Sequence, residues 1–549
     1  MTVAGTVAQA LIRAARSDRG IRAIEHDGRP LSLSYAALLD DALQIAGALV
    51  SRGLKPGDRV ALVIPEISGF IRAFFGISAA GLVPVPLCPP AQAGDVATFA
   101  KQSQHILDAS HASAVVTSSA VAPLLDLTGL DRLTVLALDA SSDATPLAEP
   151  IRRSMDDVAL LQFTSGSTAA PKGVVLTHAN LYANVAGIVG PHGLGARTTD
   201  IGVSWLPLYH DMGLIGMLLA AMYARLDTII MSPVLFLKRP SSWLETISRY
   251  KATVSFAPNF AYELCVRRVK PSQIEGFDLA SWRLAGCGAE PIRADTLRAF
   301  ASHFAAAGFD RSSFVPSYGL AEHALAVCFA QRLVIDTVDA DRLVRQSIAV
   351  PSVNGSRRVV RLVACGRPFP HHELRIVDED GRSLPDRHVG AIVCRGPSVM
   401  QGYFENPSAT AEALRGGWLA TGDLGYLADG QLFVCGRTKD LIIRQGRKYH
   451  PPDLEAAIAE LPGLRTSGIV VFAIDHLDEA DEVVAVLEAR ASAASHDIED
   501  QVRRRVRETA GLELDRVVVT PPGSIPRTTS GKVRRSETRE RFRMGTLSE

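Results

Sequence analysis

Residues 164–173 combine hydroxyl groups, glycine and lysine in a way that suits phosphate binding. The segment contains Thr164, Ser165, Gly166, Ser167 and Thr168, and Lys172 follows shortly after. Hydroxyls and free backbone N–H groups can surround a polyphosphate, while a lysine offsets its charge. A Walker A loop is excluded, because Pro171 precedes the lysine where that motif requires glycine. The residues predict a phosphate loop, and a surface turn of the same composition stays open as the alternative.

Four further segments carry residues that could act together with this loop. They are Tyr318-Gly319-Leu320-Ala321-Glu322, Thr421-Gly422-Asp423, Gly436-Arg437-Thr438-Lys439-Asp440 and Ser530-Gly531-Lys532. A carboxylate offers two acceptor oxygens, and arginine or lysine offers only donors. Each segment alone also suits a capped turn or a solvated surface, so the residue types by themselves leave both interpretations open.

The five segments, in this order, resemble the motifs of the adenylate-forming superfamily, which includes acyl-CoA ligases, peptide-synthetase adenylation domains and luciferases. The resemblance extends over nearly the whole chain. Residues 203–215, residues 258–264, Gly288-Ala289-Glu290-Pro291 and the long interval at 323–364 are most similar to the fatty acyl-AMP ligases. In that branch, an extra segment is thought to restrict the domain closure that the use of free CoA requires.

The resemblance implies a reaction with two steps. ATP would activate a fatty or similar carboxylic acid to acyl-AMP with release of pyrophosphate, and Mg²⁺ would assist. The acyl group would then pass to the phosphopantetheine of a holo acyl carrier protein. Because the substrate carboxylate is itself the nucleophile, the enzyme has to position it and neutralise charge, and no catalytic serine or cysteine is needed.

The resemblance also implies three catalytic residues. Lys532 would bridge the carboxylate and the α-phosphate as charge develops, and His210 would lie near the reacting carboxylate. Glu322 would bind Mg²⁺, which prefers oxygen ligands. Lys439 matches the hinge about which the small domain rotates between the two half-reactions.

A larger set of residues is expected, again by resemblance, to bind ATP or AMP. Tyr318 would stack on adenine, while Asp423 and Arg437 would contact the ribose. The full set is Thr164, Ser165, Gly166, Ser167, Thr168, Lys172, Gly288, Ala289, Glu290, Tyr318, Gly319, Asp423 and Arg437.

Alternating helix and strand patterns would position these loops. Residues 35–51 carry apolar side chains on one helical face after Ser34, a suitable N-cap. Short apolar, β-branched runs at 59–64, 114–117 and 227–231 predict buried strands. This alternation is typical of an α/β fold with mainly parallel sheets, in which ligand loops lie at strand ends.

Length and a change of pattern predict two domains. A chain of 549 residues exceeds one ordinary core, and the pattern shifts after Gly436. There we expect a helix at 452–461, a strand at 468–472 and a charged helix at 498–509. The prediction is a large N-terminal domain of several subdomains (residues 1–436) with the ATP and acyl pockets, and a small mobile C-terminal α/β domain (residues 437–549) with the lysine loop.

The composition limits which partners and which cellular compartment we expect for the protein. Lys+Arg and Asp+Glu both total 58, so no overall field would attract nucleic acid. No apolar run approaches the roughly 18 residues of a membrane span. Seven scattered cysteines without a CxxC pair favour a reducing compartment, so we expect a cytoplasmic protein. Arginines clustered in residues 503–543 suit either solvated helix faces or the docking of an acidic carrier protein.

Two alternative functions stay open. An acyl-CoA ligase would share the first half-reaction and use free CoA as acceptor. A catalytically silent protein that binds nucleotide or acyl-adenylate is disfavoured, because it would have no reason to keep Lys172, Glu322, Asp423, Arg437 and Lys532 together. Acyl pockets consist of ordinary apolar residues, so the motifs do not specify the chain length of the acid.

Overall fold

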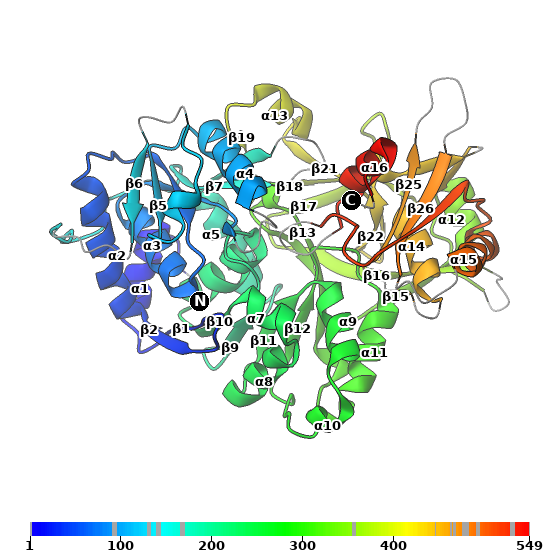
Figure 1. Cartoon of the computed structure of the whole chain (residues 1–549), viewed down its shortest axis with the longest axis horizontal. Coiled ribbons are helices and arrows are strands. Elements are labelled where there is room, and N and C mark those ends of the chain that lie inside the picture. The colour runs from blue at the N-terminus through cyan, green and yellow to red at the C-terminus, as the bar shows by residue number, and fades with distance from the viewer. Residues whose placement is uncertain are drawn as a thin grey trace.

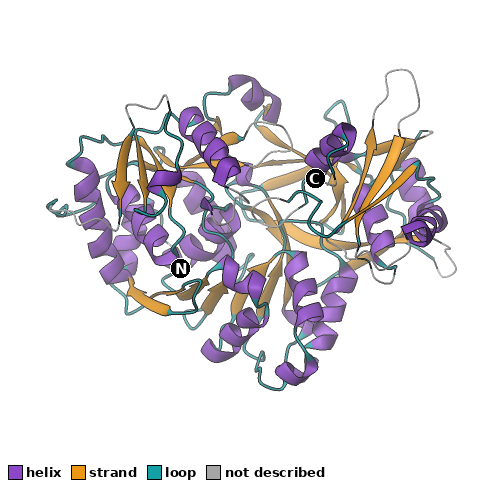
Figure 2. Ribbon diagram, viewed as in Figure 1, coloured by secondary structure: helices purple, strands orange, loops and turns teal. Residues whose placement is uncertain are grey.

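The computed structural model describes residues 3–90, 96–128, 133–138, 144–164, 171–353, 358–444, 446–461, 464, 468–474, 482–489, 495–527 and 533–547. Strands run through the middle of the molecule and helices lie mainly on the outside (Figure 2). The blue N-terminal helices and the orange and red C-terminal elements lie at opposite ends of the long axis (Figure 1). The chain thus has the predicted α/β architecture.

The largest sheet has a mostly parallel part. In spatial order, its strands are β13 (Phe314–Gly319), β12 (Leu284–Cys287), β11 (Val254–Ala257), β9 (Ile201–Ser204), β10 (Asp227–Met231), β1 (Gly20–Ile24) and β2 (Pro30–Ser34). All pairs from β13 to β1 are parallel, and β2 is antiparallel to β1. Strand β11 is buried along its whole length, as expected where helices cover both faces of a sheet.

The same sheet continues as an antiparallel part that the sequence pattern did not reveal. Its strands are β14 (Ala326–Phe329), β16 (Val359–Pro368), β22 (Gln431–Arg437), β21 (Trp418–Ala428), β18 (Gly390–Arg395) and β17 (Glu373–Val377), with β15 (Ile335–Asp339) beside β16 and β20 (Leu414–Arg415) beside β21. Antiparallel neighbours need only short turns. Asp429 and Gly430, both with positive φ, form the tight turn between β21 and β22.

Smaller sheets complete the fold. A parallel sheet contains β4 (Val83–Pro86), β3 (Arg59–Val63), β5 (Ala114–Thr117) and β6 (Thr134–Ala137), and an antiparallel sheet contains β19 (Gly402–Tyr403), β8 (Lys172–Thr177) and β7 (Val158–Thr164). The C-terminal region has β23 (Ile442–Arg444) with β24 (Arg447–Tyr449), and β25 (Ile469–Ile474) with β26 (Glu482–Glu488) and β27 (Arg516–Thr520). Strands β3, β5 and β10 lie where the apolar runs predict them.

The described helices include one at residues 35–50, where the apolar periodicity predicts it. They are α1 (Val7–Ala14), α2 (Tyr35–Val50), α3 (Ile67–Ala79), α4 (Val96–Ala109), α5 (His178–Val189), α6 (Ala220–Ala224), α7 (Pro233–Lys238), α8 (Ser241–Tyr250), α9 (Asn259–Arg268), α10 (Pro271–Ile274), α11 (Ala294–His303), α12 (Ala340–Gln346), α13 (Pro407–Ala413), α14 (Pro451–Ala459), α15 (Ser495–Ala510) and α16 (Arg535–Met544). The Ser34 side chain caps α2 by accepting from the Ala37 N–H, as predicted. None of the described helices is both long and apolar enough to cross a membrane.

The hydrophobic core divides along the chain. The largest cluster draws its buried residues from Val7 to Leu432, whereas two other clusters draw theirs from Ile442 to Leu547. The C-terminal clusters contain α14, β25 and α15, which match the predicted helix, strand and helix. Val344 of α12 packs against one of these clusters, so α12 connects the two regions.

All seven cysteines are free thiols. Burial raises the pKa of six of them, Cys265, Cys287, Cys328, Cys365, Cys394 and Cys435. A raised pKa keeps a thiol protonated and poorly nucleophilic at neutral pH. These six side chains therefore act as small apolar groups in the core.

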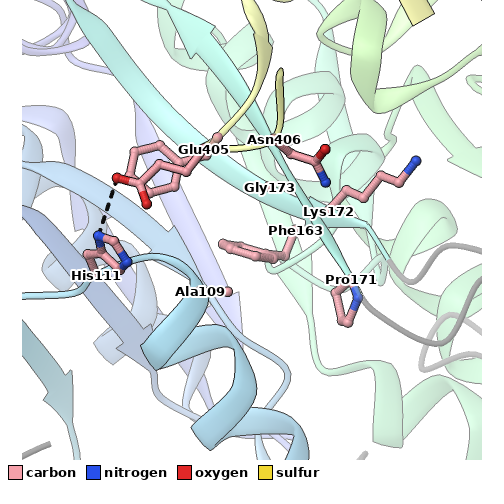
Figure 3. A pocket seen from close by; sticks show the side chains of 9 residues that line it. Ala109, His111, Phe163, Pro171, Lys172, Gly173, Glu405 and Asn406 are labelled. Carbon is pink, nitrogen blue, oxygen red and sulfur yellow. Dashed lines mark ion pairs between the residues drawn. The ribbon is translucent and has the colours of Figure 1, made fainter. Parts of the chain in front are cut away.

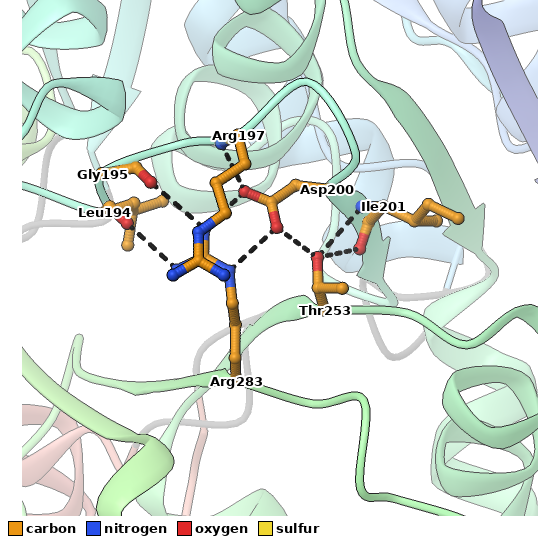
Figure 4. Close-up of polar contacts among 7 residues, drawn as sticks. All are labelled: Leu194, Gly195, Arg197, Asp200, Ile201, Thr253 and Arg283. Carbon is orange, nitrogen blue, oxygen red and sulfur yellow. Dashed lines mark hydrogen bonds and ion pairs between the residues drawn. The ribbon is translucent and has the colours of Figure 1, made fainter.

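A buried ionic network ties together the starts of three adjacent parallel strands (Figure 4). Asp200 precedes β9, Thr253 precedes β11 and Arg283 precedes β12. Arg283 Nε and Thr253 Oγ1 donate to Asp200 Oδ1 at 2.9 and 2.8 Å, and the Arg197 N–H donates to Oδ2 at 2.7 Å. Burial opposes ionisation, but these hydrogen bonds outweigh it and lower the pKa of Asp200. The network fixes the sheet from which the functional loops emerge.

We predict that Asp200→Ala lowers the free energy of unfolding by about 2 kcal/mol, because it leaves the Arg283 charge without its carboxylate. This is below the cost for a fully buried pair, since the Arg283 side chain is 22% exposed. Because the pKa of Asp200 is lowered on folding, its contribution is present above the unfolded pKa of about 4 and is lost as the pH falls below it. Urea unfolding of wild type and variant at pH 7 and pH 3 measures both effects.

Asp278 provides the control, since it forms an exposed ion pair with Lys251. Asp278→Ala should leave the unfolding midpoint nearly unchanged, as is usual for surface pairs. If the two variants lost the same free energy of unfolding, the buried network would have no special role in stability.

Candidate active site

The predicted motifs lie at the carboxyl ends of neighbouring strands. His210 follows β9, Asn259 follows β11, Gly288 follows β12, and Gly319 and Glu322 lie at and just after the end of β13. Carboxyl ends of parallel strands meet at one edge of a sheet, where ligands bind in open α/β folds. Residues far apart in the sequence are thus gathered at a single edge.

The turn after β12 holds Gly288, Ala289 and Glu290 in a close-packed arrangement. A Cβ at Gly288 would collide with Ser317 Oγ on β13, so only glycine fits there. Ala289 has a φ of +68°, in the left-handed region. Glu290 Oε1 accepts a hydrogen bond from the Phe260 N–H at 2.6 Å, in the first turn of α9. One oxygen of Glu290 therefore accepts a hydrogen bond from the main chain of α9. The motif alone did not indicate this structural contact.

Three of the predicted nucleotide-binding residues form a connected group. Tyr318 Oη donates to Asp423 Oδ2 at 2.7 Å, and Arg437 Nε lies 3.4 Å from Asp423 Oδ1. Asp423 and Arg437 face each other across β21 and β22. Burial and the neighbouring Asp423 raise the pKa of Tyr318, so its phenol stays a hydrogen-bond donor. The adenine and ribose residues expected from the motifs are brought together.

The turn between Gly319 and Glu322 is also sterically determined. A Cβ at Gly319 would collide with the carbonyl of Leu325, which accepts a hydrogen bond from the Leu320 N–H at 2.8 Å. The chain therefore folds back on itself directly after β13 and presents Glu322 beside the sheet edge.

The predicted phosphate loop lies between two antiparallel strands, β7 and β8. Thr164 at the end of β7 pairs with Lys172 at the start of β8. Ser165, Gly166, Ser167 and Thr168 lie outside the described residues, as does Lys532. Gln162 of β7 donates to the carbonyl of Tyr209 at 2.9 Å, which links this hairpin to the loop that carries His210.

His210 lies between β9 and a π-helix, Met212–Leu219. Its ring is tilted against that of Tyr209, with the centroids 4.8 Å apart. A Cβ at Gly213 would collide with the Pro207 carbonyl, so glycine permits the close turn. π-helical segments occur frequently at functional sites. The sequence pattern predicts no such segment here.

Tyr403, which none of the quoted motifs contains, contacts two of the predicted site residues. The Lys172 Nζ lies 5.0 Å from the centroid of its ring, and its hydroxyl donates to Glu322 Oε1 at 2.8 Å. Burial and Glu322 raise the pKa of Tyr403, so the hydroxyl is protonated. Only the pairing of the two-residue strand β19 with β8 brings Tyr403 here, and short strands leave no periodic signal.

A single carboxylate, that of Glu322, suits a magnesium ion that arrives with ATP. No group of three or more His, Cys, Asp or Glu side chains in the described part of the chain could enclose a metal ion. Glu322 offers a carboxylate with one oxygen bonded to Tyr403. Mg²⁺ commonly takes one or two carboxylates and completes its shell with phosphate oxygens and water, so Glu322 fits such an ion.

The predicted hinge residue Lys439 lies in a short turn, Thr438–Asp440, directly after β22. Its side chain is exposed. The next residue, Asp440, accepts from Arg535 Nη1 at 2.7 Å, and Arg535 Nη2 donates to Glu455 Oε1 at 2.6 Å. The link between the two regions is thus anchored to the C-terminal side.

Comparison with known proteins identifies the class. Residues 11–404 match the model of the family described as AMP-binding enzyme. The "Putative acyl-CoA synthetase" of Caulobacter vibrioides is 39% identical, covering 99% of this chain and 96% of that protein. The medium-chain-fatty-acid–[acyl-carrier-protein] ligase JamA of Moorena producens is 35% identical, covering 94% and 91%.

A solved structure from a study of fatty acyl-adenylate ligases of E. coli and L. pneumophila has a TM-score of 0.92, with 37% identity and 98% coverage of both chains. The protein is an adenylate-forming enzyme. The chain belongs to the AMP-binding enzyme family. The resemblance noted from its motifs and the α/β fold predicted from its alternating helix and strand patterns are confirmed.

We predict that Asp423→Ala weakens ATP binding at least about tenfold, because the ribose would lose a carboxylate with two acceptor oxygens. Isothermal titration calorimetry with ATP measures the dissociation constant directly. An unchanged dissociation constant would show that Asp423 does not bind the nucleotide.

Asp336 offers a closely matched control. It accepts from Tyr426 Oη at 2.8 Å and from Arg387 Nη1 at 2.9 Å, so it repeats the Tyr–Asp–Arg grouping away from the sheet edge. The side chains of Asp336 and Asp423 are 12% and 14% exposed. Asp336→Ala should lower stability but leave the affinity for ATP unchanged.

Proposed function

We propose that this protein uses ATP to convert a fatty acid to acyl-AMP and pyrophosphate, and then transfers the acyl group to the phosphopantetheine of a holo acyl carrier protein. The observation that carries the proposal is the convergence of Lys172, Glu322 and the Tyr318–Asp423–Arg437 group around one sheet edge. The acyl and acceptor assignments are supported by the relatives, one of which is named as a fatty-acid–carrier-protein ligase.

In the first step, the protein would orient ATP for attack by the substrate carboxylate. Tyr318 would stack on adenine, while Asp423 would accept from the ribose hydroxyls. Thr164, Ser165, Gly166, Ser167, Thr168 and Lys172 would hold the β- and γ-phosphates, and Glu322 would hold Mg²⁺, which would neutralise charge on the polyphosphate. His210 would lie beside the carboxylate, because its loop is bonded to the phosphate hairpin through Gln162.

A mobile lysine would complete the site. We propose a division into residues 1–436 and residues 437–549, supported by the separate hydrophobic clusters on the two sides. Rotation about Lys439 would carry Lys532 into the site for adenylation and away from it for transfer. A positive charge supplied only as negative charge develops lowers the barrier selectively.

We predict that Lys532→Ala slows acyl-adenylate formation about a hundredfold or more, while ATP binding largely survives. Pyrophosphate release with a panel of fatty acids and calorimetry with ATP provide the two measurements. Lys448→Ala, at an exposed lysine of β24, is the matched control and should leave both unchanged. Near-normal pyrophosphate release by Lys532→Ala would refute the assignment.

The contacts of the long interval at 323–364 favour a carrier protein as acceptor. Arg358 Nε donates to the Glu508 carbonyl at 2.8 Å and its Nη2 donates to the Arg507 carbonyl at 3.3 Å, at the end of α15. Val344 packs on the C-terminal core. These contacts would restrict the domain closure that the use of free CoA is expected to require. A relative named as an acyl-CoA synthetase keeps CoA as the alternative acceptor.

The arginines clustered in residues 503–543 would offer a carrier protein only a limited basic surface on this chain. Most of them are engaged within the C-terminal region, since Arg505 pairs with Glu460, Arg507 with Glu513 and Arg535 with Asp440 and Glu455. Arg504 and Arg543 are exposed. A docking site for an acidic carrier protein would therefore depend on these exposed side chains.

We predict that the acyl group passes to holo carrier protein much faster than to free CoA, and that Arg358→Ala raises the rate with CoA. Parallel transfer assays with both acceptors, started from the same fatty acid and ATP, measure this ratio. Arg361→Ala is the matched control, because Arg361 is an exposed arginine of β16, three residues after Arg358, and lies near Asp295 instead. Faster transfer to CoA by the wild type would establish the acyl-CoA ligase function.

A further inference from the structure

We propose that Tyr403 is a positioning residue for the phosphate site: its ring holds the Lys172 ammonium, and its hydroxyl orients Glu322 for a divalent cation bound with ATP. The inference rests on the proposed function and adds a residue that the family motifs in the sequence did not supply. It starts from the two contacts of Tyr403, which join the phosphate hairpin to the turn after β13.

The main chain on both sides of Tyr403 is fixed to the phosphate hairpin. Tyr403 pairs with Val174 of β8, and the Phe404 N–H donates to the Gly173 carbonyl at 2.7 Å. The Tyr403 N–H donates to Thr410 Oγ1 at 2.9 Å. Tyr403 therefore keeps its position relative to Lys172, because both belong to the same small sheet.

A second set of contacts clamps the residues after Tyr403. Glu405 Oε1 lies 3.3 Å from His111 Nδ1, beside a cavity of about 260 Å³ (Figure 3). His111 and Glu405 have φ values of +47° and +49°, which are strained for residues with side chains. The Arg59 guanidinium lies 5.6 Å from the ring centroid of Phe404 and donates to the His111 carbonyl at 2.9 Å.

Strained backbone persists where surrounding contacts over-determine it, and it clusters at functional sites. The His111–Glu405 pair joins the turn before β5 to the segment after β19. In Figure 3, the Lys172 side chain points away from this pair. The His111–Glu405 contact thus lies directly after Tyr403 in the chain, beside the cavity that Lys172 also lines.

The two groups of Tyr403 perform different tasks. The face of an aromatic ring attracts an ammonium group, so the ring keeps Lys172 in place before polyphosphate arrives. The hydroxyl donates a hydrogen bond to one carboxylate oxygen of Glu322. This contact sets the direction in which the other carboxylate oxygen faces. Orientation of a ligand by such a neighbour commonly affects metal affinity by about 10- to 100-fold.

Two substitutions separate these tasks. Tyr403→Phe keeps the ring and removes only the hydrogen bond to Glu322, whereas Tyr403→Leu removes both contacts. We expect Tyr403→Phe to raise the Mg²⁺ concentration that half-saturates ATP binding by about tenfold, with no change in ATP affinity when Mg²⁺ is absent. Tyr403→Leu should in addition weaken ATP binding without Mg²⁺, by about three- to tenfold.

Calorimetric titration of the full-length protein with ATP, at a series of Mg²⁺ concentrations and in EDTA, measures both quantities without relying on turnover. Tyr426→Phe is the matched control, because it also removes a tyrosine hydroxyl that donates to a carboxylate at 2.8 Å. It should leave the Mg²⁺ dependence unchanged.

The outcomes distinguish this inference from the proposed function. If the wild type binds ATP with Mg²⁺ but Tyr403→Phe has the wild-type Mg²⁺ dependence, the positioning role is overturned. A shift of equal size in Tyr426→Phe overturns it as well, because the effect would then be general. If the wild type binds no ATP at any Mg²⁺ concentration, the proposed function itself fails.

Discussion

The hydrogen bond from Tyr318 to Asp423 joins the two halves of the largest sheet at the candidate site. Tyr318 belongs to the last parallel strand, and Asp423 belongs to the antiparallel part that follows. A buried phenol and a carboxylate with little exposure would each be costly without a partner. Together they satisfy each other and fix the relative position of Tyr318 and Asp423, which are proposed to contact adenine and ribose.

The family motifs predicted a set of site residues from the sequence, and the described members lie at or next to strand ends. Strands β3, β5 and β10 and helix α2 were predictable from their apolar patterns and, for α2, from the Ser34 cap. Tyr403 was not predictable, since its position depends on a two-residue strand that pairs with a distant hairpin. The hydrogen bond from the Phe260 N–H to Glu290 Oε1 is equally non-local. Contacts between segments far apart in the sequence are decided by packing and leave no local periodicity.

Residue types alone do not define a binding site in this fold. Tyr426, Asp336 and Arg387 form a group with nearly the same chemistry as Tyr318, Asp423 and Arg437. The first group lies beside a buried cluster with Tyr426 and Phe433 and serves packing. The second lies at the carboxyl edge of a parallel sheet, where open backbone groups and neighbouring loops can receive a ligand. Location in the topology thus separates a structural group from a candidate functional one.

Strand β22 carries Arg437 at its end, only two residues before Lys439. In a rigid rotation, displacement grows with distance from the axis. Under the proposed rotation about Lys439, Arg437 and the facing Asp423 would therefore move very little, whereas a residue on the far side of the small domain would sweep a long arc. The nucleotide sugar would stay bound close to the rotation axis while the catalytic lysine leaves the site. The acyl-adenylate would therefore be retained between the two half-reactions.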